Sequence, residues 1–177
     1  MIAFCLGSAA CVFEDWYNAL AVATPDIVIG VNRIGRDWHK PLDAWVSYHP
    51  EHLSSWISER RAEGLPDHRS YWTCERRTGV IDWTPPNGET LNVHLPVSGS
   101  SGLGAVEVAI THFGADRVIL CGIPMTPTPH YNSYAADVPP QWDECARYHR
   151  FWRAYPEEKR AKVRSMSGWT RELLGAP

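Results

Sequence analysis

The chain has 177 residues and a formal net charge of −3, from 17 Lys and Arg against 20 Asp and Glu. The basic residues are dispersed, without the concentrated positive charge of a DNA-binding surface, so we expect no nucleic acid partner. The length is typical of one domain, here residues 1–177. Nine tryptophans are spread along the chain, and most of such a set should lie in the core or in subunit contacts, which leaves a homo-oligomer open.

The cysteines and apolar runs indicate a cytoplasmic protein. No two cysteines form a C-x-x-C pair, and Cys5 and Cys121 fall in apolar runs, as small buried residues of a reducing compartment do. The first apolar run stops at Leu6 with no basic segment before it, and no stretch of about 18 apolar residues follows. We therefore expect no secretory signal and no membrane partner.

Short apolar runs alternate with helix-like segments through the first half of the chain. An apolar run bounded by turn residues predicts a buried strand, and a longer segment with one apolar helical face predicts a helix. In chain order the predicted elements are a strand over 2–6, a helix over 9–23, a strand over 26–32, a loop or single helical turn over 33–40, a strand over 44–49, a helix over 51–63 and a strand over 69–74.

The second half continues the alternation. Its predicted elements are edge strands over 79–83 and 91–94 around a turn at 85–88, a helix over 103–113, a strand over 117–122, a polar loop over 123–140, a helix over 140–155, a charged turn over 156–160, a strand over 162–167 and a closing turn over 171–175 capped by Thr170. This order predicts a three-layer, Rossmann-like α/β domain with a mainly parallel sheet and helices on both faces. The loop over 123–140 is typical of a substrate or lid loop, with a protein-contact loop as the alternative.

A run of serines and glycines over 98–102 directly precedes the helix over 103–113. The first N–H groups of a helix have no intrahelical partner, glycine lets a ligand approach closely, and hydroxyls cap the helix or donate to the ligand. We therefore predict that Ser100, Ser101 and Gly102 bind a phosphate or carboxylate. The alternative is that Ser100 or Ser101 is only the N-cap of the helix. The turn matches neither the P-loop nor the G-x-G-x-x-G motif, so as a motif it is weak.

Polar or glycine residues also end three predicted strands. Gly7 and Ser8 end the first strand, Asn32 the second and His49 the third. Because ligands of α/β sheets bind at the carboxyl ends of the strands, all should face one crevice. Asn32 can hydrogen-bond a base or ribose, or it is an ordinary turn residue.

His49 and His130 are the candidate bases for chemistry in this crevice, although an ordinary hydrogen-bonded loop histidine is the alternative for each. His49 and His52 have a spacing compatible with a metal, but no third ligand is evident, so we predict no metal site. Mg²⁺ would need clustered carboxylates, and the acids in or next to the predicted loop are Asp137, Asp143 and Glu144. The sequence therefore does not indicate Mg²⁺ or a cofactor beyond a nucleotide substrate.

Five stretches together carry a family resemblance. They read GS at 7–8, VIGVN at 28–32, AWVSYHPEHL at 44–53, SGSSGLGAVEVAITHFGADRVILCGIPM at 98–125 and VRSMSGWTRELLG at 163–175. The succession resembles the DUF115-type proteins, which are grouped with bacterial sialyltransferase-like glycosyltransferases that use CMP-sugars and with archaeal 6-hydroxymethylpterin pyrophosphokinases. Its most specific part is the stretch 101–123.

The resemblance implies roles for named residues. By it, the nucleotide is held by Gly7, Ser8, Asn32, Ser101 and Gly102, and Tyr131 or Tyr134 reaches the phosphate. The chain departs from the family where its first turn reads GSAA in place of the usual G-x-G-P-S, and where RSMS at 164–167 occupies the position of the family's basic histidine.

We therefore expect a nucleotide-binding transferase, a small glycosyltransferase-like enzyme that passes a sugar from a nucleotide-sugar to an unknown acceptor. A non-catalytic nucleotide-binding or sensing module is the alternative, which the missing histidine favours. A pyrophosphokinase-like phosphoryl transferase is a second alternative, and it would require magnesium.

Overall fold

A computed structural model describes residues 1–73, 90–92, 99–133 and 142–177. The predicted edge strand over 79–83, the turn at 85–88, Tyr134 and Asp137 lie outside the described residues.

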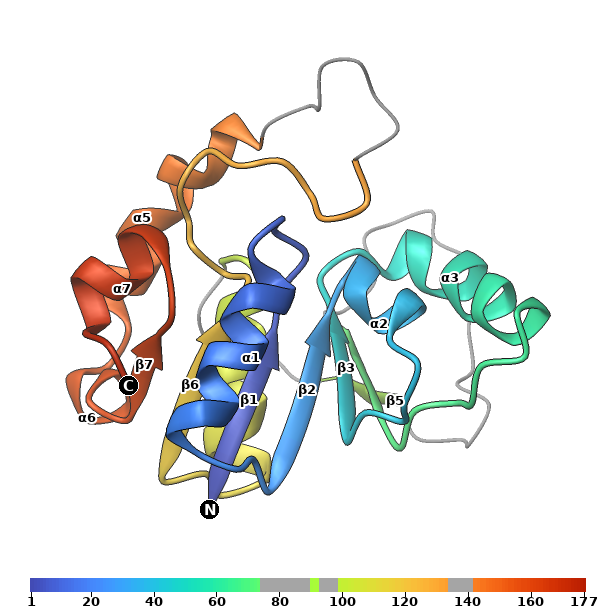
Figure 1. The fold of residues 1–177 in the computed structure, drawn as a ribbon, viewed down its shortest axis with the longest axis horizontal. Helices are drawn as coiled ribbons and strands as arrows, with labels where there is room; N and C mark the ends of the chain where they lie inside the picture. Colours follow the sequence, from blue (N-terminus) through green and yellow to red (C-terminus); the bar gives the residue numbers. More distant parts are fainter. Residues whose placement is uncertain (74–89, 93–98, 134–141) are drawn as a thin grey trace.

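The described strands form one sheet in which every pairing is parallel (Figure 1). The order across the sheet is β5-β4-β3-β2-β1-β6-β7. The strands are β1 (Ile2–Leu6), β2 (Ile27–Val31), β3 (Ala44–Ser47), β4 (Tyr71–Thr73), β5 (Thr90–Asn92), β6 (Arg117–Cys121) and β7 (Val163–Ser165). The chain moves outward from β1 to β5 and then returns to place β6 on the other side of β1. The strand order therefore reverses between β1 and β6, the kind of position at which α/β sheets bind ligands.

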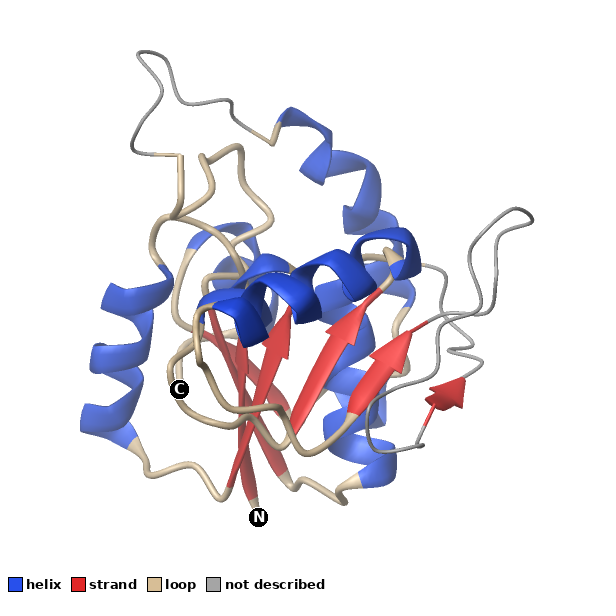
Figure 2. Ribbon diagram, turned by 90° about the vertical axis from the view of Figure 1, so that its right-hand side faces the viewer, coloured by secondary structure: helices blue, strands red, loops and turns tan. Residues whose placement is uncertain are grey.

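Helices cover both faces of this sheet, as Figure 2 shows. The helical elements are α1 (Val12–Val22), α2 (Arg33–Asp37), α3 (Pro50–Ala62), α4 (Ser101–Glu107), the π-helical η1 (Val108–His112), the 3₁₀ η2 (Asp143–Tyr148), α5 (His149–Ala154), α6 (Glu157–Arg160) and α7 (Gly168–Leu174). The apolar residues of α1 and α3 pack on one face, and those of α4, α5 and α7 pack on the other. The structure confirms the predicted three-layer α/β class.

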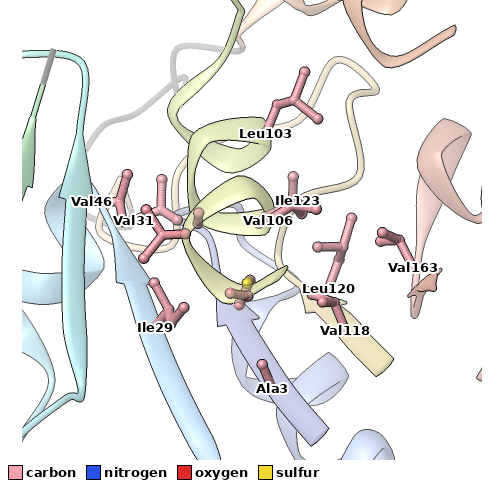
Figure 3. Packing of buried hydrophobic residues seen from close by; sticks show 14 of the residues in the cluster. Ala3, Ile29, Val31, Val46, Leu103, Val106, Val118, Leu120, Ile123 and Val163 are labelled. Carbon is pink, nitrogen blue, oxygen red and sulfur yellow. The ribbon is translucent and has the colours of Figure 1, made fainter. Parts of the chain in front are cut away.

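β1 shows why its sequence is continuously apolar. Phe4 and Leu6 belong to the core beneath α1, whereas Ala3 and Cys5 belong to the core beneath α4, and all four are fully buried. A strand with both faces covered has no position for a polar side chain. Figure 3 shows the α4 side of this core, which brings Leu103 and Val106 of α4 together with Val31 and Ile123.

Three predictions for the second half differ from the structure. The segment predicted as one helix over 140–155 is, where described, a 3₁₀ helix followed by α5. The predicted charged turn over 156–160 contains the short helix α6. The prediction that Thr170 caps the closing turn is wrong, because Thr170 lies inside α7, is fully buried and donates its hydroxyl hydrogen to the Ile123 carbonyl at 2.6 Å.

A buried arginine and a buried histidine hold α2 against its surroundings. Arg60 is 0% exposed, and its guanidinium donates to the carbonyls of Gly35, Arg36 and Trp38, which end α2. His68 accepts from the Leu42 N–H through Nδ1 at 3.0 Å and donates to the Gly35 carbonyl through Nε2 at 2.6 Å. These bonds require a neutral imidazole, and burial lowers the pKa of His68 to about 4.

We predict that His68 makes stability depend on pH. Between pH 6.5 and 4 the unfolded chain holds a proton on His68 that the folded chain does not, so this part of the stability is complete above about pH 6.5 and is lost as pH falls. The loss amounts to about 3 kcal/mol by pH 4. Urea denaturation at several pH values should therefore show the wild type approaching His68→Gln in unfolding free energy as the solution is acidified. A gap between the two proteins that stays constant with pH would contradict this assignment.

Candidate functional site

The candidate site is the edge of the sheet where the parallel strands end, which we call the carboxyl edge. It lies at the top of the sheet in Figure 1, with the loops after β1, β2, β3 and β6 and the beginning of α4.

Asn32, directly after β2, is held in a conformation that side-chain-bearing residues rarely adopt, with φ 54° and ψ −132°. Its backbone N–H donates to the Val46 carbonyl at 3.0 Å, and its own carbonyl accepts from the Trp45 indole at 2.7 Å. Its side-chain Oδ1 accepts from the Ser47 hydroxyl at 2.9 Å. Among the described residues nothing accepts from its Nδ2, so an amide donor held in a strained backbone remains open at the edge.

The turn before α4 supplies two more open donors. Ser100 is the N-cap of α4, the alternative given for Ser100 or Ser101, and its hydroxyl accepts from the Leu103 N–H at 3.3 Å. Its carbonyl accepts from the Gly104 N–H at 3.1 Å. In the described part of the chain the N–H groups of Ser101 and Gly102 have no acceptor, although both residues are buried.

Two hydrogen bonds from consecutive residues tie these donors into one group. Ser47 donates to the Asn32 side chain, and the next N–H, that of Tyr48, donates to the Ser101 hydroxyl at 3.0 Å. The end of β3 therefore bridges Asn32 and the start of α4. We call the Asn32 side-chain amide and the Ser101 and Gly102 N–H groups the amide cluster.

The first turn of the chain is used differently. The Gly7 N–H donates to the Cys121 carbonyl at 2.7 Å. The Ser8 hydroxyl donates to the Val31 carbonyl at 3.1 Å and accepts from the Ile34 N–H at 3.2 Å. These groups are engaged within the protein, so the predicted contact of Gly7 and Ser8 with a nucleotide stays a prediction that would need these bonds to be shared or exchanged.

Ile123, which is 6% exposed, lies between the two predicted glycine contacts. A Cβ on Gly7 would lie 2.5 Å from Ile123 Cγ1, and a Cβ on Gly102 would lie 2.9 Å from Ile123 Cγ2. Gly7 is therefore required by the Gly122 backbone, whose carbonyl oxygen would lie 2.1 Å from that Cβ, as well as by Ile123. Gly102 is required by Ile123, and neither requirement depends on a ligand. The same side chain therefore lies between Gly7 and the start of α4.

The two candidate bases are both exposed at the carboxyl edge. His130 Nδ1 lies 3.2 Å from the Ser8 carbonyl, which can only accept, so Nδ1 carries the hydrogen and Nε2 is the basic nitrogen. His49 is the N-cap of α3, its N–H donates to Ser47 Oγ at 3.0 Å, and its ring lies 5.9 Å from that of His52. The Ser8 carbonyl therefore fixes the tautomer of His130.

Tyr131 turns away from the amide cluster. Its ring packs edge-on against Phe13 of α1, and its hydroxyl bonds to the Arg33 carbonyl and the Asp37 carboxylate. Burial and the Asp37 charge raise the pKa of Tyr131. Its predicted phosphate contact stays a prediction, with the hydroxyl engaged elsewhere.

Two groups of edge residues were not predicted. Thr73 ends β4 level with Ser47, is 7% exposed, and its Oγ1 has no hydrogen-bond partner among the described residues. The second group lies on η2 and α5, where Phe151 reaches the turn before α4: a Cβ on Gly99 would lie 3.5 Å from Phe151 Cβ. The signal for it is the alternation of arginine and aromatic residues in RYHRFWR at 147–153.

Within the described ranges no three His, Cys, Asp or Glu side chains gather in a way that could hold a metal ion. None of the described helices is both long and apolar enough to cross a membrane. Comparisons of the chain with protein-family models, with curated proteins and with solved structures find no match.

We predict that the Asn32 backbone is strained. Asn32→Gly and Asn32→Ala both remove the side-chain amide, but only alanine keeps a Cβ in this conformation. Asn32→Gly should therefore have an unfolding free energy about 1 kcal/mol higher than Asn32→Ala, because relief of strain exceeds the entropic cost of glycine. Urea denaturation of the two variants measures the difference. An alanine variant as stable as the glycine variant would show that the backbone is unstrained.

Proposed function

We propose that this protein is a nucleotide-binding transferase, a small glycosyltransferase-like enzyme that uses a nucleotide-activated sugar. The observation that carries the proposal is the amide cluster, in which Asn32, Ser101 and Gly102 offer open N–H donors at the carboxyl edge of a doubly wound parallel sheet. Open donors at this edge suit an anionic ligand, and phosphate is the anion for which such edges are generally used.

The proposed reaction requires a base for the acceptor and a group that stabilises the departing phosphate. A hydroxyl of the acceptor loses its proton to the basic nitrogen of a histidine, and its oxygen forms a bond to the anomeric carbon of the sugar. The bond from that carbon to the nucleotide phosphate breaks, and the departing phosphate takes the electron pair. The amide cluster would stabilise the charge that develops on the phosphate. His130 Nε2 is the candidate base tested here, with His49 as the alternative.

A nucleotide-binding module without turnover is the second candidate, and the first turn favours it. Gly7 and Ser8 are bonded within the protein, and Ile123 lies between Gly7 and Gly102. The groups open to a nucleotide-sugar are therefore fewer than the prediction for a transferase required.

A pyrophosphokinase-like reaction has less support. It would need carboxylates for magnesium close to the cluster. Of the described acids in question, Asp143 and Glu144 are exposed, and Glu144 is paired with Arg147 at 2.8 Å.

A cytoplasmic location also remains part of the proposal. The described cysteines, Cys5, Cys11, Cys121 and Cys145, are all free thiols, which is usual in a reducing compartment. Burial raises the pKa of Cys11 to about 11, so this half-buried thiol stays protonated and unreactive at neutral pH.

A thermal-shift screen of 5′-nucleoside monophosphates, followed by release assays with CMP-, UDP- and GDP-sugars, tests the proposal. A nucleotide at a hundred times its dissociation constant should stabilise the fold by about 2.7 kcal/mol. Turnover should fall at least about 100-fold in His130→Ala, the usual scale for loss of a general base, while nucleotide affinity is retained. Binding without turnover would establish the module instead, and a screen in which no nucleotide binds would overturn both candidates.

A further inference from the structure

The strongest unassigned feature is a row of half-buried rings and exposed arginines on η2 and α5, which we call the arginine–aromatic ledge. Resting on the proposed function, we infer that the ledge is the second half of the nucleotide site, with Arg150 binding the phosphate and the Tyr148 and Phe151 rings binding the base. The ledge consists of Trp142, Arg147, Tyr148, Arg150 and Phe151.

The ledge is anchored at both ends to the carboxyl edge. At its start, the Trp142 N–H donates to the carbonyl of Thr128, in the loop after β6, at 3.2 Å. At its other end, Phe151 Cβ and Cγ lie 3.5 and 3.7 Å from where a Cβ on Gly99 would be. Gly99 is followed by Ser100, the N-cap of α4, so the ledge ends beside the turn that leads into α4. In Figure 1 η2 and α5 lie above and to the left of the strand ends.

The rings form a continuous row. The centroids of Trp142 and Tyr148 are 5.5 Å apart, and those of Tyr148 and Phe151 are 6.4 Å apart, with interplanar angles of 35° and 41°. All three rings pack against the core on one side and remain partly exposed. A partly exposed aromatic ring can stack against a nucleobase, whichever base it is, on a face that neither the core nor an arginine covers.

The two arginines of the ledge differ in whether a carboxylate of the described residues pairs with them. Arg147 lies over the Tyr148 ring at 4.8 Å and is paired with Glu144. Arg150 lies over the Phe151 ring at 4.7 Å, is exposed, and has no carboxylate partner in the described ranges. A guanidinium held by its face on a ring keeps its N–H edge free, and that edge matches the oxygens of a phosphate.

This combination selects one class of ligand. An inorganic anion would use Arg150 and the amide cluster but leave the rings empty, and a nucleoside would use the rings but not the arginine. A nucleoside 5′-phosphate uses both. Arg150 is thus a binding residue for the phosphate, distinct from the base assigned to His130.

The experiment compares Arg150→Ala with Arg153→Ala. Arg153 is a matched control, because it is also exposed and lies over a ring, that of Trp169 at 5.3 Å, so both variants lose one positive charge and one arginine–ring contact. Calorimetric titrations with the four 5′-ribonucleoside monophosphates and their nucleosides measure dissociation constants. We expect Arg150→Ala to weaken binding of the preferred monophosphate at least about tenfold and of its nucleoside less than about twofold, with Arg153→Ala close to the wild type.

Two further variants complete the test. Arg150→Lys keeps the charge but not the two-pronged geometry, and should fall between wild type and Arg150→Ala. Phe151→Leu should weaken monophosphate and nucleoside alike. If the wild type binds monophosphates and Arg150→Ala binds them equally well, or if the two arginine variants lose the same affinity, the ledge assignment is overturned and the proposed function stands. If the wild type binds no monophosphate, both are overturned.

Discussion

The parallel pairing of β1 with β2 on one side and β6 on the other is the constraint on which the rest of the structure depends. It sets Leu6 level with Gly30 and with Cys121, so the strands flanking the reversal of strand order end together. Because helices bury both faces of these strands, polar side chains and unpaired N–H groups can lie only at the strand ends. At the carboxyl edge the chain places Ser8, Ser47, Ser100 and Ser101, the strained Asn32 and the open N–H groups.

At this edge the polar groups divide into two sets. The Gly7 N–H and the Ser8 hydroxyl form hydrogen bonds within the protein, which join the end of β1 to the ends of β6 and β2. Those of Asn32, Ser101 and Gly102 are positioned by similar bonds but keep donors open. An unpaired buried N–H costs free energy, and in the proposed function a bound phosphate would satisfy the N–H groups of Ser101 and Gly102.

The sequence was sufficient for the parts of the fold that depend on local pattern. Residue type and spacing were enough to predict the buried strand over 2–6 and the polar residues at the strand ends. They also offered a serine cap at Ser100 or Ser101 as an alternative, and they predicted that Asn32 and Ser101 share one edge. Contacts between distant segments were not readable in this way. That Ile123 would fill the space between Gly7 and Gly102, or that Tyr131 would bury its hydroxyl against Asp37, depends on how loops far apart in sequence pack together.

The central claim, that the open N–H groups at the start of α4 bind a phosphate, is tested most directly by removing one amide hydrogen. Proline is well tolerated at the first position of a helix, and Ser100 already has the extended conformation that a following proline requires, with φ −84° and ψ 154°. Ser101→Pro removes the N–H, whereas Ser101→Ala removes only the hydroxyl. Titration with a 5′-nucleoside monophosphate should give a dissociation constant at least about tenfold higher for Ser101→Pro than for Ser101→Ala, since hydrogen bonds to charged groups contribute about 1.5 to 3 kcal/mol. Equal affinities in two folded variants would contradict the claim.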